Sequence, residues 1–409
     1  MFNKRKTIFI FNQFAISPDM PGGTRHYDFG RELVKKGYYV YIFASDFSYQ
    51  KLQYMKLKEG EEYSLENVNG VKFVWVRTVP YKKNNYKRIL NQISFSINAV
   101  RVAKALPVKP DIVIGSSPTL FTALFSLNYA NKIKADFVAE IRDLWPESLY
   151  GLNPKLKYHP YTLVLKIISR FVYRKSKKII VFTKGNKKYI SEFTNAKIMY
   201  IPNGVARNMF YNVGSRREIR GKYGFEKFTF VYTGAIGVAN GIDTIVEACR
   251  LIVNKEIKVE IFGSGPLKDE VISLIDKYNL KNIRINLPVR KEEIPALLFS
   301  ADAAIITLKN IPLFRFGVSP NKLFEYMYAG LPVICAIEGE MGDMIRDANC
   351  GYVVTPEDPS DLAEKMLKIY SLSQKEREKM GRNGKKYIEN RFLREYLEEK
   401  LEKVLIDYD

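Results

Sequence analysis

The sequence predicts two doubly wound α/β domains in one chain, and three observations support this fold class. Short apolar runs alternate with segments of helical periodicity, as parallel strands covered by helices on both faces require. The same alternation occurs before and after a Pro-Asn-Gly turn signal at residues 201–204. At about 150 residues per domain, a chain of 409 residues is long enough for two such cores.

The first half, residues 1–200, contains six apolar runs with the length of buried strands. Its first helix is expected over residues 23–36. Because the runs are continuously apolar rather than alternating, they favour a parallel sheet buried on both faces. The predicted strands cover residues 7–11, 39–43, 71–76, 111–114, 136–141 and 178–182.

The second half repeats this pattern, with a polar segment at 212–224 that we interpret as a loop. The chain beyond Pro359 is expected to be helical to its end, with two segments at 377–390 and 393–406. The predicted strands cover residues 228–232, 258–262, 283–287, 303–306, 332–335 and 351–354.

Composition excludes several classes of protein. With 46% apolar and 27% charged residues, the chain is neither disordered nor collagen-like. No apolar run approaches the ~18 residues of a spanning helix, and the N-terminus lacks the apolar stretch of a signal peptide. Three cysteines, Cys249, Cys335 and Cys350, are too few and too scattered for a disulfide framework. We therefore expect a cytoplasmic protein.

The net charge of +21 is concentrated in the first half. Residues 1–200 hold 34 Lys and Arg against 14 Asp and Glu, whereas residues 201–409 hold 31 against 30. Such asymmetry is typical of a domain that contacts nucleic acid or an anionic membrane surface.

Glycine turns follow strands in both halves. Gly22 and Gly23 follow the first strand, while Gly234, Gly237 and Gly263 follow strands of the second half. Glycines at a helix N-terminus let the backbone approach an anionic ligand, although each turn alone is equally consistent with steric demand. Glycine turns in two domains predict a ligand held between them.

Residues 316–334 form the most specific segment. Ser319 and Pro320 begin a helix whose free N–H groups, together with Lys322, would face an anion such as a diphosphate. Glu325 lies one turn further along the same face, where a carboxylate would accept both hydroxyls of a ribose.

The order of these motifs resembles the retaining GT-B glycosyltransferases of family 4. Two further motifs, at 142–147 and 319–322, resemble the branch that builds O-antigen and capsule repeats, which includes L-fucosamine (N-acetyl-fucosamine) transferases. The motifs that carry the family resemblance are Gly22-Gly23, Ile201-Pro202-Asn203-Gly204, Gly234 to Gly241, Gly263-Ser264-Gly265 and Glu325-x-x-x-Ala329-Gly330-x-Pro332.

The resemblance implies a fold and an arrangement of domains. Two Rossmann-like domains would face each other across a cleft. Residues 1–200 would bind acceptor and membrane, residues 201–385 would bind the nucleotide sugar, and residues 386–409 would form a C-terminal helix that crosses back to the first domain.

The resemblance also implies a hexosyltransferase reaction with retention. A sugar, N-acetyl-fucosamine or another N-acetylated hexose, would pass from a UDP-linked donor to a polyprenyl-diphosphate-linked saccharide in O-antigen, capsule or lipopolysaccharide synthesis. Helix N-termini and Lys322 would meet the charge on the leaving diphosphate, so that neither metal nor another cofactor is expected. No His/Cys cluster has metal-ligand spacing.

The chain departs from the family pattern at the diphosphate site. The family's Arg and Lys fall on Ala235 and Asn240, and its first glutamate falls on Gly317. Lys322, with Arg290 or Arg315, is expected to replace the missing cations. The expected donor-binding residues are Gly22, Gly23, Gly234, Gly237, Asn240, Gly263, Pro288, Arg290, Ser319, Pro320, Asn321, Lys322 and Glu325.

The acceptor base in this family usually follows a strand of the first domain. Asp143 has that place, with Glu140 and Glu147 as competitors and a structural ion pair with Arg142 as the alternative. Arg25 and His26 are expected at the acceptor site, and a packing role is the alternative for His26.

An acid-free basic stretch between Glu147 and Glu192 is expected to dock the protein on the inner face of the cytoplasmic membrane. Each Lys or Arg near an anionic leaflet contributes about 1 kcal/mol. The alternative is a helix whose apolar face packs on its own sheet. The expected membrane-facing cations are Lys166, Arg170, Arg174, Lys175, Lys177 and Lys178, and a segment with Lys82, Lys83, Lys87 and Arg88 extends the face.

Two other functions are weighed against the transferase. A sugar-nucleotide 2-epimerase would share the build but needs no lipid acceptor and hence no basic face. A nucleic-acid-binding protein would use the charge, but the chain has no recognition-helix, RNA-sheet or zinc-finger pattern and would leave the glycine turns without a role. No nucleic-acid partner is therefore expected.

Overall fold

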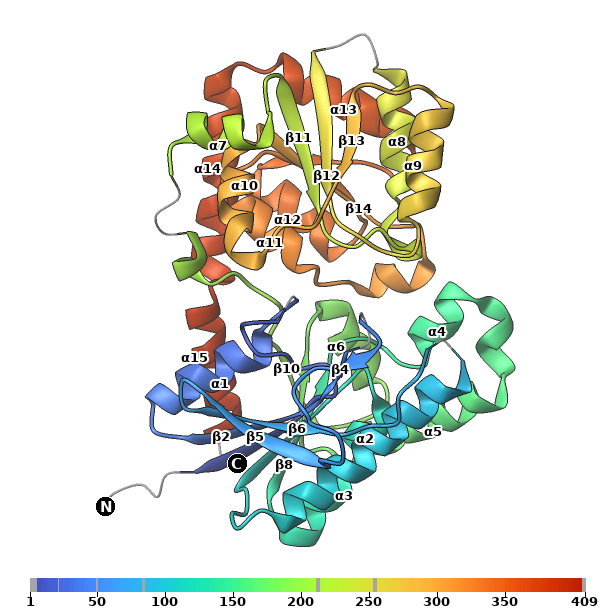
Figure 1. Cartoon of the computed structure of the whole chain (residues 1–409), viewed down its shortest axis with the longest axis vertical. Coiled ribbons are helices and arrows are strands. Elements are labelled where there is room, and N and C mark those ends of the chain that lie inside the picture. Colours follow the sequence, from blue (N-terminus) through green and yellow to red (C-terminus); the bar gives the residue numbers. More distant parts are fainter. Residues whose placement is uncertain are drawn as a thin grey trace. The chain divides into compact units, whose positions relative to one another are not determined.

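The computed structural model describes residues 6–20, 22–48, 51–82, 85–210, 214–252 and 256–406. Lys83 falls outside these ranges, as do the side chains of Leu152, Arg315 and Phe316, so the expected role of Arg315 is not addressed by the structure. The chain divides into unit 1, Met1–Ile201 with Glu398–Asp409, and unit 2, Pro202–Leu397 (Figure 1). The return of the chain to unit 1 thus begins at Glu398, later than the 386 expected.

Unit 1 is built on an eight-stranded sheet of order β10-β9-β8-β7-β1-β2-β6-β5, in which only β5 is antiparallel to its neighbour. Its strands are β1 (Thr7–Phe11), β2 (Tyr39–Ser45), β5 (Tyr63–Val68), β6 (Val71–Val76), β7 (Ile112–Ser116), β8 (Asp136–Ile141), β9 (Lys178–Val181) and β10 (Lys197–Tyr200). A small hairpin joins β3 (Phe47–Ser48) and β4 (Gln53–Tyr54). All six strands predicted for the first half are confirmed.

Helices cover the unit 1 sheet (Figure 1). Among them, α2 packs against α3, and α3 packs against α5. At the far end of the chain, Lys178 Nζ donates to the carbonyl of Val404 at 2.9 Å and Lys36 pairs with Glu402, so the last turns of α15 belong to this unit. The helices are α1 (Arg25–Lys35), α2 (Tyr86–Ala105), α3 (Leu120–Ile133), α4 (Glu147–Leu152), η1 (Pro154–Tyr158), α5 (Pro160–Lys175), α6 (Lys184–Ser191) and α15 (Arg394–Ile406).

Unit 2 is built on a six-stranded, all-parallel sheet of order β13-β12-β11-β14-β15-β16. The strands are β11 (Phe228–Thr233), β12 (Ile257–Phe262), β13 (Ile283–Asn286), β14 (Ala303–Thr307), β15 (Val333–Ala336) and β16 (Gly351–Val353), which confirms the six runs predicted. A hydrophobic core of the unit lies where α8 (Ile242–Leu251), α9 (Lys268–Lys277) and α13 (Pro359–Ser371) pack against the sheet.

The remaining helices of unit 2 include the one that carries Lys322 and Glu325. This helix, α11, packs against α14 so closely that a Cβ added to Gly381 would lie 1.8 Å from the carbonyl oxygen of Gly330. The helices are η2 (Arg207–Phe210), α7 (Arg216–Tyr223), η3 (Val238–Asn240), η4 (Lys291–Glu293), α10 (Ile294–Ser300), η5 (Pro312–Phe316), α11 (Asn321–Tyr328), α12 (Glu340–Ala348) and α14 (Gln374–Arg391).

The segment 212–224, expected as a loop, contains helix α7, and that expectation is wrong. The polar composition misled the prediction because α7 is held by charge rather than by an apolar face. Arg216 and Arg220 both pair with Asp302, and Gly224 ends the helix in the left-handed conformation.

Each sheet reverses its strand order beside its first strand. In unit 1 the chain moves from β1 to β2 on one side and to β7 on the other, and in unit 2 from β11 to β12 and to β14. Ligands of open α/β sheets bind beyond the carboxyl ends of the strands at such a switch point. Within the described ranges, no helix is both long and apolar enough to cross a membrane.

Candidate functional site

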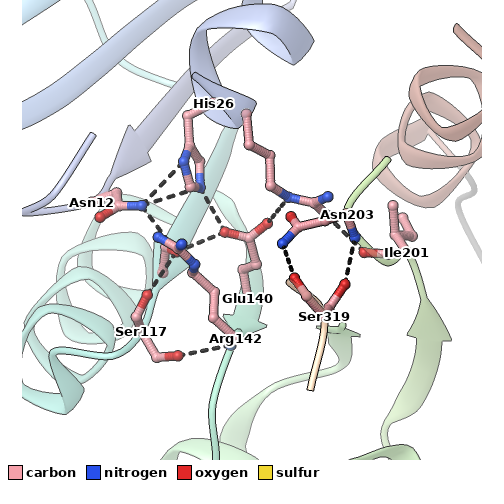
Figure 2. A network of polar contacts seen from close by, with 10 residues as sticks. Asn12, His26, Ser117, Glu140, Arg142, Ile201, Asn203 and Ser319 are labelled. Carbon is pink, nitrogen blue, oxygen red and sulfur yellow. Dashed lines mark hydrogen bonds and ion pairs between the residues drawn. The ribbon is translucent and has the colours of Figure 1, made fainter. Parts of the chain in front are cut away.

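The switch point of unit 2 lies beside the N-terminus of α11. Pro320 is the N-cap of α11 and contributes no side-chain cap. The turn before it is held by Asn203, whose amide donates to the Ser319 carbonyl at 2.6 Å and whose N–H donates to Ser319 Oγ at 3.1 Å (Figure 2). Asn203 thus fixes the Ser319 turn from within unit 2.

Lys322 projects from the first turn of α11 onto the glycine turn that follows β11. Its Nζ donates to the Tyr232 hydroxyl at 2.7 Å and lies 4.0 Å from the centre of that ring. A Cβ at Gly234, which has a φ of 135°, would lie 2.8 Å from the Lys322 Nζ. A side chain at 234 would thus displace the Lys322 ammonium, and the positive φ also favours glycine there.

Electrostatics distinguish Lys322 and Glu325 from surface charges. Burial lowers the pKa of Lys322 to about 7, with Glu325 opposing the shift. Burial also raises the pKa of Glu325, although Arg394, Lys291 and Lys322 oppose it. In the described structure neither side chain makes an ion pair, which leaves both available to a ligand.

The other predicted donor residues of unit 2 fall into two groups. Gly263 lies against Gly234, since a Cβ at Gly263 would sit 1.9 Å from the Gly234 carbonyl, and Gly237 lies beside Asn240. Pro288 and Arg290 are exposed, and Arg290 pairs with Glu293 at 3.3 Å. The structure therefore shows no contact between Arg290 and the Lys322 site.

The switch point of unit 1 holds a buried network centred on Glu140, at the end of β8. Glu140 accepts from His26 Nε2 at 2.6 Å, from Ser116 Oγ at 2.6 Å and from Arg25 Nε at 3.2 Å (Figure 2). Because Nε2 faces the carboxylate, His26 Nδ1 is left to accept from the Asn12 amide at 3.1 Å. Burial alone would raise the pKa of Glu140, but His26 and Arg25 hold it far below its usual range.

Arg25 and His26 are interior residues of unit 1. Arg25 also donates to the Ile201 carbonyl at 2.8 Å, and its guanidinium lies 4.5 Å and 4.1 Å from the ring centres of Phe29 and Phe182. Both side chains are buried, so they do not form part of a membrane-facing surface. Gly22 and Gly23, in the turn before α1, are exposed.

Asp143 differs from its two competitors. Glu140 and Glu147 are buried and engaged, Glu147 by the Tyr189 hydroxyl and by Arg170. Asp143 is exposed just beyond the end of β8 and makes no hydrogen bond within the described structure. Arg142 beside it is held at its backbone, whose N–H donates to Ser117 Oγ at 2.8 Å.

Helix α5 presents a mixed apolar and basic surface. Lys166, Arg174, Lys175 and Lys177 are exposed. The apolar face is only partly packed: Leu165, Ile168 and Val172 are buried, while four apolar side chains are exposed. We define the outer face of α5 as these four, Leu163, Val164, Ile167 and Phe171, with Lys166 and Arg174.

Two cations expected on this surface lie elsewhere. The Arg170 side chain is only 16% exposed, because it stacks on Phe193 and donates to the Tyr189 hydroxyl at 2.8 Å. Lys178 is held by the Val404 carbonyl. An interior acid, Glu147, draws Arg170 inward, which the spacing of basic residues did not predict.

Sequence reasoning missed Asn12, Ser116 and Tyr232. Tyr232 did carry a signal, since a tyrosine inside a buried apolar strand needs a partner for its hydroxyl. Asn12 immediately follows the predicted strand 7–11, and Ser116 lies two residues beyond the predicted strand 111–114. Nothing in their spacing indicates which carboxylate they contact. The described residues include no cluster of His, Cys, Asp and Glu arranged to hold a metal ion.

Two family models match the chain in succession. Residues 22–208 match the model described as Glycosyltransferase Family 4, and residues 215–387 match that described as Glycosyl transferases group 1. The probable glycosyltransferase WbjE of Pseudomonas aeruginosa is 25% identical over 70% of this chain and 71% of its own length. The putative colanic acid biosynthesis glycosyl transferase WcaI of Escherichia coli is 23% identical over 71% and 75%.

Solved structures share the fold over almost the whole chain. Sucrose-phosphate synthase from Thermosynechococcus elongatus superposes with a TM-score of 0.78 at 15% identity, covering 98% of both chains. HepE of Anabaena, solved in complex with UDP-glucose, has a TM-score of 0.71 at 14% identity and covers 98% of this chain and 99% of its own. Two Rossmann-like units of the GT-B type, as predicted, are confirmed.

Glu140→Gln is expected to destabilise unit 1 by about 3–5 kcal/mol at pH 7, since it leaves Arg25 buried without its carboxylate. A depressed carboxyl pKa contributes stability above the unfolded value of about 4.3 and loses it as the pH falls. The difference between wild type and variant should therefore shrink by about 1.4 kcal/mol per pH unit below that value.

Scanning calorimetry at pH 7 and pH 3.5 measures both effects. Glu62→Gln, which breaks an exposed pair with Arg101, is the matched control and should change stability by less than about 0.5 kcal/mol. Equal effects of the two substitutions would contradict the assigned role of Glu140.

Proposed function

We propose that this chain, a glycosyltransferase of the group 1 and family 4 type, transfers an N-acetylated hexose such as N-acetyl-fucosamine from a UDP-linked donor to a polyprenyl-diphosphate-linked saccharide in O-antigen or capsule synthesis. One observation carries the proposal: Lys322 and Glu325 lie one turn apart on the same face of α11, at the switch point of unit 2. In the described structure neither side chain has an ion-pair partner. Relatives named for polysaccharide synthesis, and a structural neighbour solved with UDP-glucose, support it.

The donor diphosphate would lie against the Lys322 ammonium and the free N–H groups at the start of α11. A helix N-terminus and a nearby cation both stabilise phosphate oxygens. Glu325, one turn along α11, would accept the two ribose hydroxyls. Because Gly234 has no side chain, the glycine turn leaves the approach to Lys322 open.

The transfer would proceed with retention and without a metal. As the bond between the sugar and the diphosphate breaks, negative charge develops on the leaving phosphate, where the Lys322 ammonium and the α11 N-terminus would stabilise it. The proton of the attacking acceptor hydroxyl would pass to that leaving diphosphate or to a carboxylate. Positioned donors of this kind need no reorganisation during the reaction.

Asp143 is the carboxylate that we assign to the acceptor site as general base. It is exposed and free of hydrogen bonds to the described residues, whereas Glu140 is held by three donors. A base must be within hydrogen-bond reach of the hydroxyl that it deprotonates. The buried network centred on Glu140 then acts as the support of this edge of the sheet.

Asp143→Asn is expected to lower the rate of transfer by about 10²–10⁴-fold, the usual contribution of a general base, while UDP affinity stays within twofold. Incorporation of radiolabel from UDP-N-acetylhexoses into lipid extracted from membranes measures transfer, and calorimetry measures UDP binding. Asp136→Asn, at the opposite end of β8, is the control and should remain active. An active Asp143→Asn enzyme would remove Asp143 as base.

The lipid-linked acceptor would be met at a membrane surface by the outer face of α5. Its exposed apolar side chains stand among Lys166 and Arg174, and an open cavity of about 640 Å³, lined by Arg174 and Lys177, lies at the C-terminal end of α5. Amphipathic helices of this composition bind anionic leaflets by apolar burial and by charge together. We propose a peripheral location on the inner face of the cytoplasmic membrane.

The double substitution Ile167→Glu with Phe171→Glu should reduce binding to phosphatidylglycerol vesicles by about tenfold or more, because it replaces inserted apolar surface with negative charge. Vesicle co-sedimentation measures the effect. Leu287→Glu is the control, since Leu287 lies in unit 2 and is 75% exposed, close to the 70% of Ile167. Unchanged binding of the double variant would show that α5 is not the anchor.

A further inference from the structure

The hydroxyl of Tyr232 joins the Lys322 cation to the backbone of the glycine turn. Tyr232 is the penultimate residue of β11 and is fully buried. Its hydroxyl donates to the Ala235 carbonyl at 2.8 Å and accepts from Lys322 Nζ at 2.7 Å. Since a phenol has one proton to donate, that proton holds the turn and the oxygen faces the amine with a lone pair. The Asn240 side chain also hydrogen-bonds to this hydroxyl.

The phenol is a suitable support for a cation because it stays neutral. Burial raises the pKa of Tyr232, so that the hydroxyl keeps its proton at any physiological pH. The Lys322 Nζ also lies 4.0 Å from the Tyr232 ring centre, where the ring face attracts positive charge. These contacts favour the charged amine without neutralising it.

The one charge shown to act on Lys322 among the described residues is that of Glu325. Glu325 follows one turn later on α11, and it is influenced in turn by Lys291 of η4 and Arg394 of α15. In the described structure Lys322 makes no ion pair, and its nearest polar partner is the neutral hydroxyl of Tyr232. The Lys322 amine is thus held in place, but no opposite charge pairs with it in the described structure.

We propose that Tyr232 positions Lys322 over the glycine turn and that binding of a nucleoside diphosphate draws a proton onto Lys322. This inference rests on the proposed function, because it concerns the same donor site. The proton comes from the buffer, and the amine becomes the ammonium that the diphosphate oxygens require. No carboxylate needs to be displaced first.

The sign of the effect follows from the environment of the amine. Burial lowers the pKa of Lys322 to about 7 in the empty protein, so at pH 8 the amine is mostly neutral. A nearby phosphate favours the charged form and raises that pKa. Below about pH 6 the amine is protonated with or without ligand. UDP affinity should therefore fall by up to about tenfold per pH unit above 7.

Titration calorimetry with UDP at pH 8.0 in Tris and in EPPS measures the proton directly, because the two buffers differ in ionisation enthalpy. At this pH the terminal phosphate of UDP, with a pKa of about 6, is already ionised. Wild type should take up most of a proton per UDP bound, because pH 8.0 lies above the amine pKa of about 7. Lys322→Arg should bind UDP with no uptake, because guanidinium is always charged.

Tyr232→Phe should weaken UDP binding at pH 8.0 by about fivefold, the worth of one hydrogen bond, and should move the midpoint of the pH dependence to lower pH. Tyr278→Phe is the matched control, since its hydroxyl bonds to Glu247 and does not touch Lys322. A wild-type midpoint in Tyr232→Phe would overturn the positioning role of Tyr232.

The possible outcomes distinguish a failure of the proton coupling from a failure of the proposed UDP site. UDP binding with no buffer dependence, or with equal uptake in Lys322→Arg, would overturn the proton coupling and leave the proposed function standing. A folded wild-type protein that binds no UDP would instead overturn the donor site itself.

Discussion

Parallel strands end together at one edge of a sheet, so a chain that winds in both directions from its first strand gathers its turns beside that strand. In unit 1 this edge collects Asn12 after β1, Ser116 at the end of β7 and Glu140 at the end of β8. In unit 2 it collects Gly263 against Gly234, and Gly234 against Lys322 in the first turn of α11. The polar residues are remote in sequence, and the winding of the sheet is what brings them together.

The surroundings of Glu140 in unit 1 and of Lys322 in unit 2 differ in how far they balance the charge of the side chain. Glu140 receives hydrogen bonds from an arginine, a histidine and a serine, and the result is a carboxylate that stays ionised and makes a rigid support. Within the described structure, Lys322 donates to one neutral hydroxyl and lies over an aromatic ring, without an ion-pair partner, and burial lowers its pKa. A compensated charge suits structure, whereas an uncompensated one suits the binding of an opposite charge.

Much of the fold could be predicted from the sequence because buried parallel strands are continuously apolar, and all twelve predicted runs are strands. Strand β5 was not predicted, because it is an antiparallel edge strand whose residues alternate between exposed and half-buried. Helix α7 was missed because arginine pairs with Asp302, rather than apolar residues, hold it in place.

Side-chain positions could be predicted where a local sequence motif determines them, but not where contacts between residues distant in sequence determine them. The spacing predicted that a helix begins after Ser319 and Pro320 and carries Lys322 and Glu325, and α11 begins there, whereas the binding of a ligand by these residues stays a prediction. The positions of Arg25 and Arg170 could not, since each is drawn inward by a carboxylate distant in sequence, Glu140 and Glu147 respectively. A basic residue on a helix has the same pattern whether it faces a membrane or a buried acid.

The donor site in unit 2 is the central claim of this account, and thermal unfolding with UDP, GDP, ADP and CDP, each with EDTA, tests it most directly. A ligand that binds only the native state adds about 2.7 kcal/mol of stability at a hundred times its dissociation constant. We predict that UDP alone raises the unfolding temperature of the wild type and that Glu325→Ala loses most of this shift. A folded wild-type sample that none of the four nucleotides stabilises would contradict the claim.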